Sequence, residues 1–225
     1  MRQLWYLALL PLLAVQCRKE EEAAVTPLPA GLQAYAYFLP GTYWIYRDSA
    51  SGQLDSVWVT SARTWVHSTK DRNRVYGRNE ELEVQMASSS STAKITYTSQ
   101  RTCIGIPDSS TFSGSDNDIV PCWLIHQHRA NDFATASAVV FAYALRVGQP
   151  ELNGAAYRYR LPQRLSGGRT FEQVVSVTTR DGDLATRAGF LTRYWWAKGL
   201  GVVQQRQYRS IGVQTWTLVR EHILQ

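Results

Sequence analysis

The chain has 225 residues, of which 44% are hydrophobic, and its 24 Lys and Arg residues outnumber its 18 Asp and Glu residues to give a formal net charge of +6. This length and apolar fraction exclude a largely disordered chain, because they allow a real core to be buried. The basic residues are mostly Arg and are spread along the whole chain without a basic block, which disfavours a nucleic-acid partner.

The first sixteen residues have the pattern of an export signal. Arg2 precedes an apolar run from Leu4 to Val15, which Pro11 interrupts. The run is too short to span a bilayer as a helix, which needs about 20 residues. We therefore expect residues 1–16 to be a signal peptide that is removed from the mature protein.

Cys17 stands where this apolar run ends, and the segment resembles a bacterial lipoprotein signal peptide. The resemblance implies cleavage before Cys17 and a diacylglyceryl group on its sulfur. It also implies acylation with fatty acids such as palmitate, which would anchor the protein in the outer membrane. The segment departs from the usual pattern, because Ala14 occupies the place of the expected Leu and Gln16 is not small. The alternative is cleavage elsewhere, which leaves Cys17 an ordinary residue.

A charged stretch follows directly. Lys19, Glu20, Glu21 and Glu22 resemble the surface-export tag of Bacteroidota lipoproteins, which implies display on the cell surface. The alternative is a solvated linker. Residues 17–34 are rich in Glu, Ala and Pro, so we expect a lipid-anchored flexible tether over this range.

The remaining two cysteines are Cys103 and Cys122. If Cys17 is lipidated, they have only each other as partner, and disulfides persist in exported proteins. Closing the Ser-, Gly- and Asp-rich loop between them contributes about 3 kcal/mol in the chain-entropy model. We expect a disulfide, and the alternative is two free thiols.

Residues 35–225 read as one all-β domain. Aromatic and β-branched runs separated by turn residues predict strands, with hairpins at 43–60 and 81–99. Residues 169–178 alternate in polarity, which predicts a half-buried antiparallel strand. Residues 134–145 suit either a helix or a strand, and we assign a strand. The expected fold is a single antiparallel domain, as a curved sheet, a barrel-like sheet or a sandwich.

Two segments of this domain resemble uncharacterised Bacteroidota lipoproteins. The first is residues 37–47, where a Pro-Gly turn leads into an aromatic strand. The second is residues 195–203, an aromatic-Ala-Lys-Gly-x-Gly-Val segment in which Gly199 and Gly201 favour a turn. The resemblance implies a secreted β-domain of unknown activity.

Three sets of residues are candidate sites. His126 and His128 lie at i and i+2 and could chelate a metal with Asp132, although two polar residues at an exposed strand end are the simpler interpretation. Arg158 and Arg160 on one strand face could bind an anion, or they could form a solvated basic face. Trp195 and Trp196, with other tryptophans, could stack on a sugar, or they could belong to the core.

We therefore expect a lipid-anchored cell-envelope protein with a binding or structural role and without enzymatic activity, cofactor or metal. Its partners would be the membrane, through the lipid, and an envelope glycan, lipid or protein. A glycan- or lipid-binding module with an aromatic cleft is the first alternative. A metal-assisted hydrolase that uses His126 and His128 is the weaker one.

Overall fold

The computed structural model describes residues 24–71, 74–102, 122–130, 135–143, 155–182 and 189–225. These residues form one helix and a single large sheet. The elements are β1 (Val25–Thr26), α1 (Ala30–Ala36), β2 (Tyr43–Asp48), β3 (Leu54–Asp71), β4 (Arg74–Ser88), β5 (Lys94–Thr102), β6 (Cys122–Ala130), β7 (Thr135–Tyr143), β8 (Ala155–Ser166), β9 (Arg169–Gly182), β10 (Gly189–Ala197), β11 (Gly201–Arg209) and β12 (Gly212–His222).

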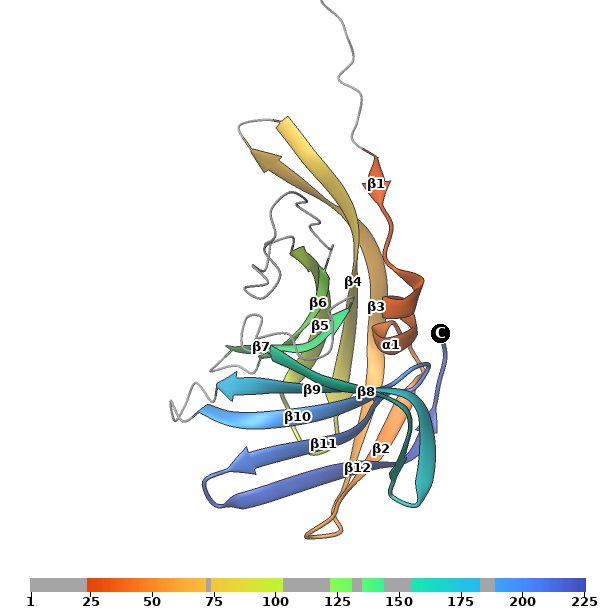
Figure 1. The fold of residues 1–225 in the computed structure, drawn as a ribbon, viewed down its shortest axis with the longest axis vertical. Coiled ribbons are helices and arrows are strands. Elements are labelled where there is room, and N and C mark those ends of the chain that lie inside the picture. Colours follow the sequence, from red (N-terminus) through yellow and green to blue (C-terminus); the bar gives the residue numbers. More distant parts are fainter. Residues whose placement is uncertain (1–23, 72–73, 103–121, 131–134, 144–154, 183–188) are drawn as a thin grey trace, which may run out of the picture.

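The strands follow the order β7-β6-β5-β4-β3-β2-β12-β11-β10-β9-β8, and β1 pairs in parallel with β4. The pairs along the main path are antiparallel, which confirms the expected all-β class. The sheet curls into a half-barrel, so that the strands late in the chain face those from its first half across an interior (Figure 1). Of the architectures that the sequence allowed, the curved sheet is the one formed.

Contacts across the interior hold the curl. Trp196 on β10 donates its Nε1–H to the carbonyl of Val140 on β7, at 3.0 Å. Tyr35 of α1 packs against Phe141 on β7, with ring centroids 5.1 Å apart, and its hydroxyl donates to the carbonyl of Gln173 on β9. The first contact joins β10 to β7, and the others join β7 and β9 through α1. Because β7 is not a hydrogen-bonded neighbour of β9 or β10 in the sheet, these contacts determine how far the sheet closes.

The expected tether over 17–34 is wrong at its C-terminal end. Residues 25–34 contribute β1 and most of α1, and Leu28 and Leu32 are buried in the core. We predicted that this segment does not fold because its few apolar residues have no neighbours in the sequence to pack against. In the structure they pack against core residues of the curled sheet. Within the residues that the structure describes, no helix has the length and apolar character needed to cross a membrane.

The predicted hairpins are confirmed. β2 pairs with β3, and β4 with β5, in antiparallel register. Residues 135–143 form a strand, β7, although their composition also suited a helix. Gly199 and Gly201 have φ of +75° and +80° in the turn between β10 and β11, as their turn assignment requires.

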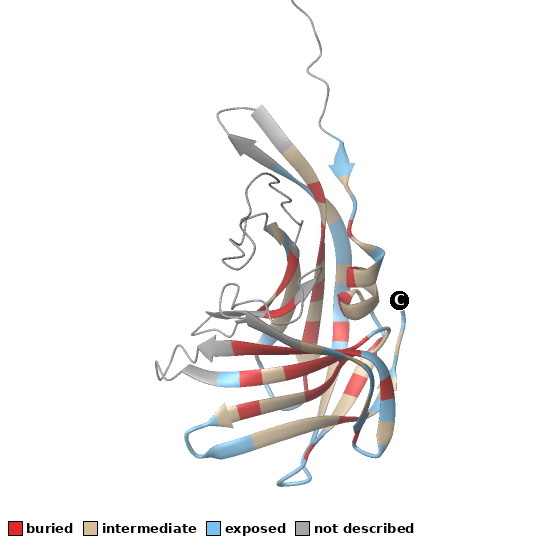
Figure 2. Ribbon diagram, viewed as in Figure 1, coloured by how far each residue is buried: buried red, intermediate tan, exposed pale blue. Residues whose placement is uncertain are grey.

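The predicted antiparallel strand over residues 169–178 is confirmed as β9, but burial of one face alone holds only as far as Glu172. Val175 and Val177 are buried, and so are Ser176 and Thr178 on the opposite face (Figure 2). The break in alternation at Val174 follows Gln173, whose φ of +47° marks a kink opposite Pro162. β9 is buried on both faces because the sheet interior covers one and neighbouring chain covers part of the other.

On that outer face Trp195 lies opposite Ser176, and Arg193 donates to Thr178. The tip of the β8–β9 hairpin bends over the same face of the sheet at β11 and β12. A Cβ at Gly167 in the tip would meet Thr217 on β12 at 2.8 Å. Arg169 next to it donates to both carboxylate oxygens of Glu221 on β12, at 2.6 and 2.5 Å. The outer face of β10–β12 therefore lies partly under this tip, and a side chain at position 167 would displace it.

Candidate functional site

A pocket of about 250 Å³ opens inside the half-barrel. It is lined from both halves of the curled sheet, by residues of β2–β6 and β10–β12. The aromatic lining residues are Phe38, Trp44, Tyr46, Tyr97, Tyr194, Trp196 and Trp216, and the polar ones are Asp55, Ser88, Ser90, Ser91, Gln127, Arg129, Gln205, Gln207, Arg209 and Gln214. Aromatic walls with several convergent polar groups are typical of small-molecule binding sites.

The aromatic floor is fixed by hydrogen bonds to main chain. Trp44 donates its Nε1–H to the carbonyl of Leu200 at 2.7 Å, and Tyr46 donates its hydroxyl to the carbonyl of Val202 at 2.8 Å. Phe38 meets Trp44 edge-on, with centroids 5.0 Å apart. Gly201 lets the chain pass this pair, because a Cβ there would lie 3.2 Å from the Phe38 ring. The rings are therefore preorganised to receive a ligand.

Burial also determines the protonation state of the Tyr46 hydroxyl in this floor. Removal from water raises the pKa of Tyr46 well above its ordinary value, and the nearby Tyr97, Asp55 and Glu221 raise it further. Tyr46 therefore keeps its proton at neutral pH and stays a hydrogen-bond donor.

Asp55 and a run of serines form one side of the pocket. Asp55 Oδ1 accepts from the hydroxyl of Ser88 at 2.8 Å, the hydroxyl of Ser89 at 3.1 Å and the amide of Ser90 at 3.1 Å. The last residue of β4 and the turn that follows it supply these three donors. Because all of them bond Oδ1, the described residues leave Oδ2 without a donor, available to a ligand.

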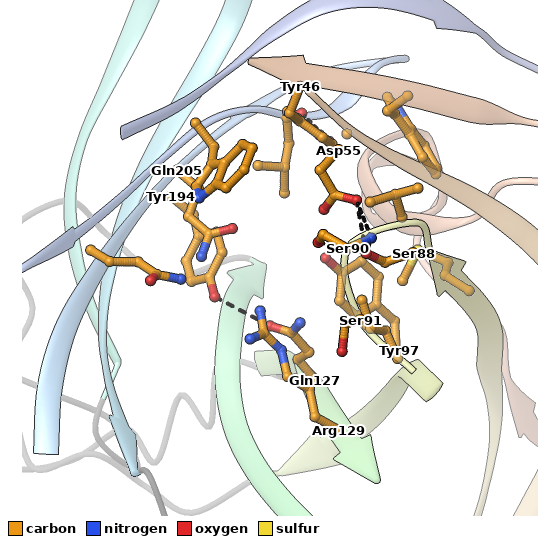
Figure 3. Close-up of a pocket in the computed structure, with 18 of the residues that line it drawn as sticks. Tyr46, Asp55, Ser88, Ser90, Ser91, Tyr97, Gln127, Arg129, Tyr194 and Gln205 are labelled. Carbon is orange, nitrogen blue, oxygen red and sulfur yellow. Dashed lines mark hydrogen bonds between the residues drawn. The ribbon is translucent and has the colours of Figure 1, made fainter. Parts of the chain in front are cut away.

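The opposite side is built on Tyr194 and Gln205, which face Asp55 across the pocket (Figure 3). Gln127 lies 3.2 Å from the Tyr194 hydroxyl. When its amide is turned so that the oxygen accepts from Arg129 at 3.0 and 3.2 Å, its nitrogen donates to Tyr194. This chain orients Arg129 at the pocket. Asp55, Arg129 and Arg209 are the charged residues among those that line it.

Of the residues that the sequence predicted for ligand binding, only some lie at the pocket. Trp196 lines the pocket, whereas Trp195 lies on the outer face, where its Nε1–H reaches the Tyr159 hydroxyl at 3.3 Å. Both indoles are buried. Arg160 is exposed on β8 and does not line the pocket, and Arg158 belongs to β8 but its side chain lies outside the described residues.

His126 and His128 do lie side by side on one face of β6, with ring centroids 6.1 Å apart and nearly parallel planes. His128 Nε2 lies 3.0 Å from the Thr98 hydroxyl, and His126 Nε2 is buried without a partner in the described part of the chain. Burial, and then the neighbouring His128, lower the pKa of His126. Among the described residues no three His, Cys, Asp or Glu side chains gather in metal-binding range, and Asp132 lies outside them.

The anchor, tag and disulfide predictions fall largely outside the described residues. Cys17, the segment from Lys19 to Glu22, and Cys103 all lie there, and Cys122 begins β6 with its side chain not described. These remain predictions.

The sequence reasoning missed the pocket residues Asp55, Gln127, Arg129 and Gln205. The sequence around Gln205 gives no signal for an interior face, because polar residues occupy both faces of β11 from Gln204 to Gln207.

No family model matches the chain, and no curated protein sequence matches it. Two solved structures are similar to it. One, from Bacteroides fragilis, is described as a "putative exported protein with YmcC-like fold"; it is 13% identical, with a TM-score of 0.38 over 82% of this chain and 98% of that chain. The other is a "putative lipoprotein" from Parabacteroides distasonis, 11% identical, with a TM-score of 0.36 over 84% of this chain and 97% of that chain. Superpositions this loose carry no argument about the role of this chain.

Proposed function

We propose that the protein is a lipid-anchored protein of the cell envelope that binds a neutral saccharide unit of an envelope glycan in the interior pocket, without catalysis. The observation that carries the proposal is the composition of the pocket. Aromatic rings, neutral amides and hydroxyls, and one carboxylate whose Oδ2 accepts no hydrogen bond from the described residues converge on a space of about 250 Å³.

The polar groups match a polyhydroxylated ligand. A sugar hydroxyl both donates and accepts hydrogen bonds. Asp55 Oδ2 can accept from one hydroxyl, and the amide of Gln205, across the pocket, can donate to one and accept from another. The apolar face of a sugar ring can lie against an aromatic wall such as Trp216.

The same lining disfavours a purely apolar ligand. An acyl chain would remove Asp55, Gln205 and Arg129 from water without replacing their hydrogen bonds, and each such group costs roughly 1–3 kcal/mol. The charges of Asp55 and of the two arginines have opposite signs, so the pocket as a whole does not select a strongly charged ligand either.

The test is calorimetric titration of the full chain with glucose, galactose, mannose and N-acetylglucosamine and with their disaccharides. Gln205→Ala removes one or two neutral hydrogen bonds, each worth about 1 kcal/mol, so the affinity for the saccharide that binds should fall about five- to thirtyfold. Gln163→Ala is the matched control, because Gln163 is exposed on β8 away from the pocket. If none of these sugars binds, or if the two variants bind equally well, the saccharide assignment is wrong.

Surface display is a separate part of the proposal, supported by the charged stretch behind Cys17. Replacing residues 19–22 with Ala should protect the protein from external protease on intact cells while its amount and lipidation stay unchanged. A variant as accessible as the parent would show that these charges serve only solvation.

A further inference from the structure

A second group of polar side chains lies on the outer face of the sheet, opposite the pocket. The guanidinium carbons of Arg164, Arg193 and Arg206 lie 4.2, 5.9 and 5.8 Å from the ring centre of Trp195. All three arginines are partly exposed, whereas Trp195 between them is buried. We call these four residues the arginine cluster.

The fold assembles the cluster from three elements. Arg193 on β10 and Arg206 on β11 are direct cross-strand partners. Arg164 lies on β8 near the bent tip of the β8–β9 hairpin, and its Nη2 donates to Oε1 of Gln204 on β11 at 2.6 Å. Residues about 30 and 40 positions apart in the sequence thus converge on one indole, and both faces of the sheet carry a candidate site.

Among the described residues, no carboxylate pairs with the arginines of the cluster. Like charges directly opposite each other on neighbouring strands are destabilising. Within the described residues, none of the three arginines forms an ion pair, since Arg193 bonds the neutral hydroxyl of Thr178 and Arg164 the neutral amide of Gln204. In contrast, Arg169 and Arg63 each pair with a glutamate.

Two donors of the cluster are also unused. The Nε–H groups of Arg164 and Arg206 are buried and have no acceptor in the described part of the chain. A buried donor without an acceptor costs free energy, and more when the group is charged. Burial lowers the pKa of Arg164, the nearby Tyr159 raises it, and the charges of Arg206 and Arg193 lower it again. An anion on the exposed side of the guanidinium groups would relieve the repulsion between them.

We propose that the arginine cluster binds a phosphate group. The planar fork of an arginine presents paired N–H donors that match the oxygens of a phosphate, and several forks on one group give multiple charge-assisted bonds. Three positive charges suit a phosphate monoester or diester better than a single carboxylate. The phosphate could belong to a lipid headgroup or to a soluble phosphorylated molecule, because the arginine cluster would bind the phosphate group that both contain. The site is independent of the saccharide pocket, which opens on the other face.

The experiment is calorimetric titration of the full chain in a neutral detergent. The probes are inorganic phosphate, glycerol 3-phosphate, short-chain dihexanoyl phosphatidylglycerol, and acetate as a monocarboxylate. We expect the phosphate-bearing probes to bind more tightly than acetate, with an affinity that falls as salt is added. Similar affinities for glycerol 3-phosphate and for the lipid would identify the phosphate alone as the determinant, and tighter binding of the lipid would identify the headgroup of a membrane lipid.

The variants separate recognition from folding. Arg206→Gln should weaken binding of glycerol 3-phosphate about tenfold or more, as loss of a charge-assisted hydrogen bond predicts. Arg206→Lys keeps the charge and loses the fork, so it should fold as the parent does and show an intermediate affinity. Arg63→Gln is the matched control, because Arg63 also lies over an indole, 5.5 Å from the ring of Trp65, but is already paired with Glu83. Absence of phosphate binding in the parent would overturn the proposal, and so would equal affinities in Arg206→Gln, Arg206→Lys and Arg63→Gln.

Discussion

Replacing Trp196 with Phe should test how the half-barrel is held closed. Ile125 on β6 pairs with Phe141 on β7 and His126 pairs with Val139, so Val140 is an extra, bulged residue with no partner opposite it. β7 is also the last strand of the sheet on that side. The carbonyl of Val140 therefore receives its hydrogen bond from the indole of Trp196.

The magnitude follows from this arrangement. A buried carbonyl that loses its donor costs about 1–3 kcal/mol. The smaller ring adds roughly 1 kcal/mol, about the value of one buried methylene. Trp196 is fully buried, against Phe141 and Tyr97, so water cannot easily replace the donor. We expect Trp196→Phe to lower the free energy of unfolding by about 2–4 kcal/mol.

Urea unfolding of the ligand-free full chain, followed by circular dichroism, measures this change as a shift of the midpoint at constant slope. Trp58→Phe is the control, because Trp58 is 39% exposed and its substitution should change stability by only about 0.5 kcal/mol or less. A Trp196→Phe variant as stable as the Trp58→Phe variant would refute the idea that this bond closes the sheet.

Three further predictions follow. The lowered pKa of His126 means that the unfolded chain binds the proton more tightly, so stability should fall as pH drops below about 6.5, and thermal unfolding between pH 7.5 and 5.5 should show a smaller drop for His126→Gln. Cys17→Ser should abolish labelling by a clickable fatty acid and release the protein from the membrane; retained label would contradict the anchor. Peptide mapping without reductant should find Cys103 joined to Cys122, and complete alkylation of both thiols in envelope-derived protein would exclude the bond.

Much of the fold was predictable because strand patterns are local. The aromatic and β-branched runs over 43–60 and the glycines at 199 and 201 specify hairpins through short-range propensity and turn geometry. The helix α1 was missed because its stability depends on burial of Leu32 and Ala36 beneath a sheet that forms elsewhere. The second buried face of β9 was missed because alternation reports one buried face and cannot show that Trp195 and Arg193 of the neighbouring strand lie against the other.

The candidate sites were predictable only in part. Trp195 and Trp196 were identified from sequence, yet neighbouring residues of a strand point to opposite faces, so they belong to different sites. Asp55 and Gln205 gave no local signal, since they are brought together from opposite halves of a curled sheet. Arg193 and Arg206 became a pair through the register of β10 and β11, which a single sequence does not state.

The sequence by itself determined the all-β class, the hairpins between neighbouring strands, and an N-terminal segment that resembles that of a lipoprotein. These features depend on composition and on residues a few positions apart. The tertiary structure decided the degree of curl, the pocket and the arginine cluster. Each of these depends on contacts between residues 40 to more than 150 positions apart, and such long-range contacts depend on strand order and register, which local propensity does not encode.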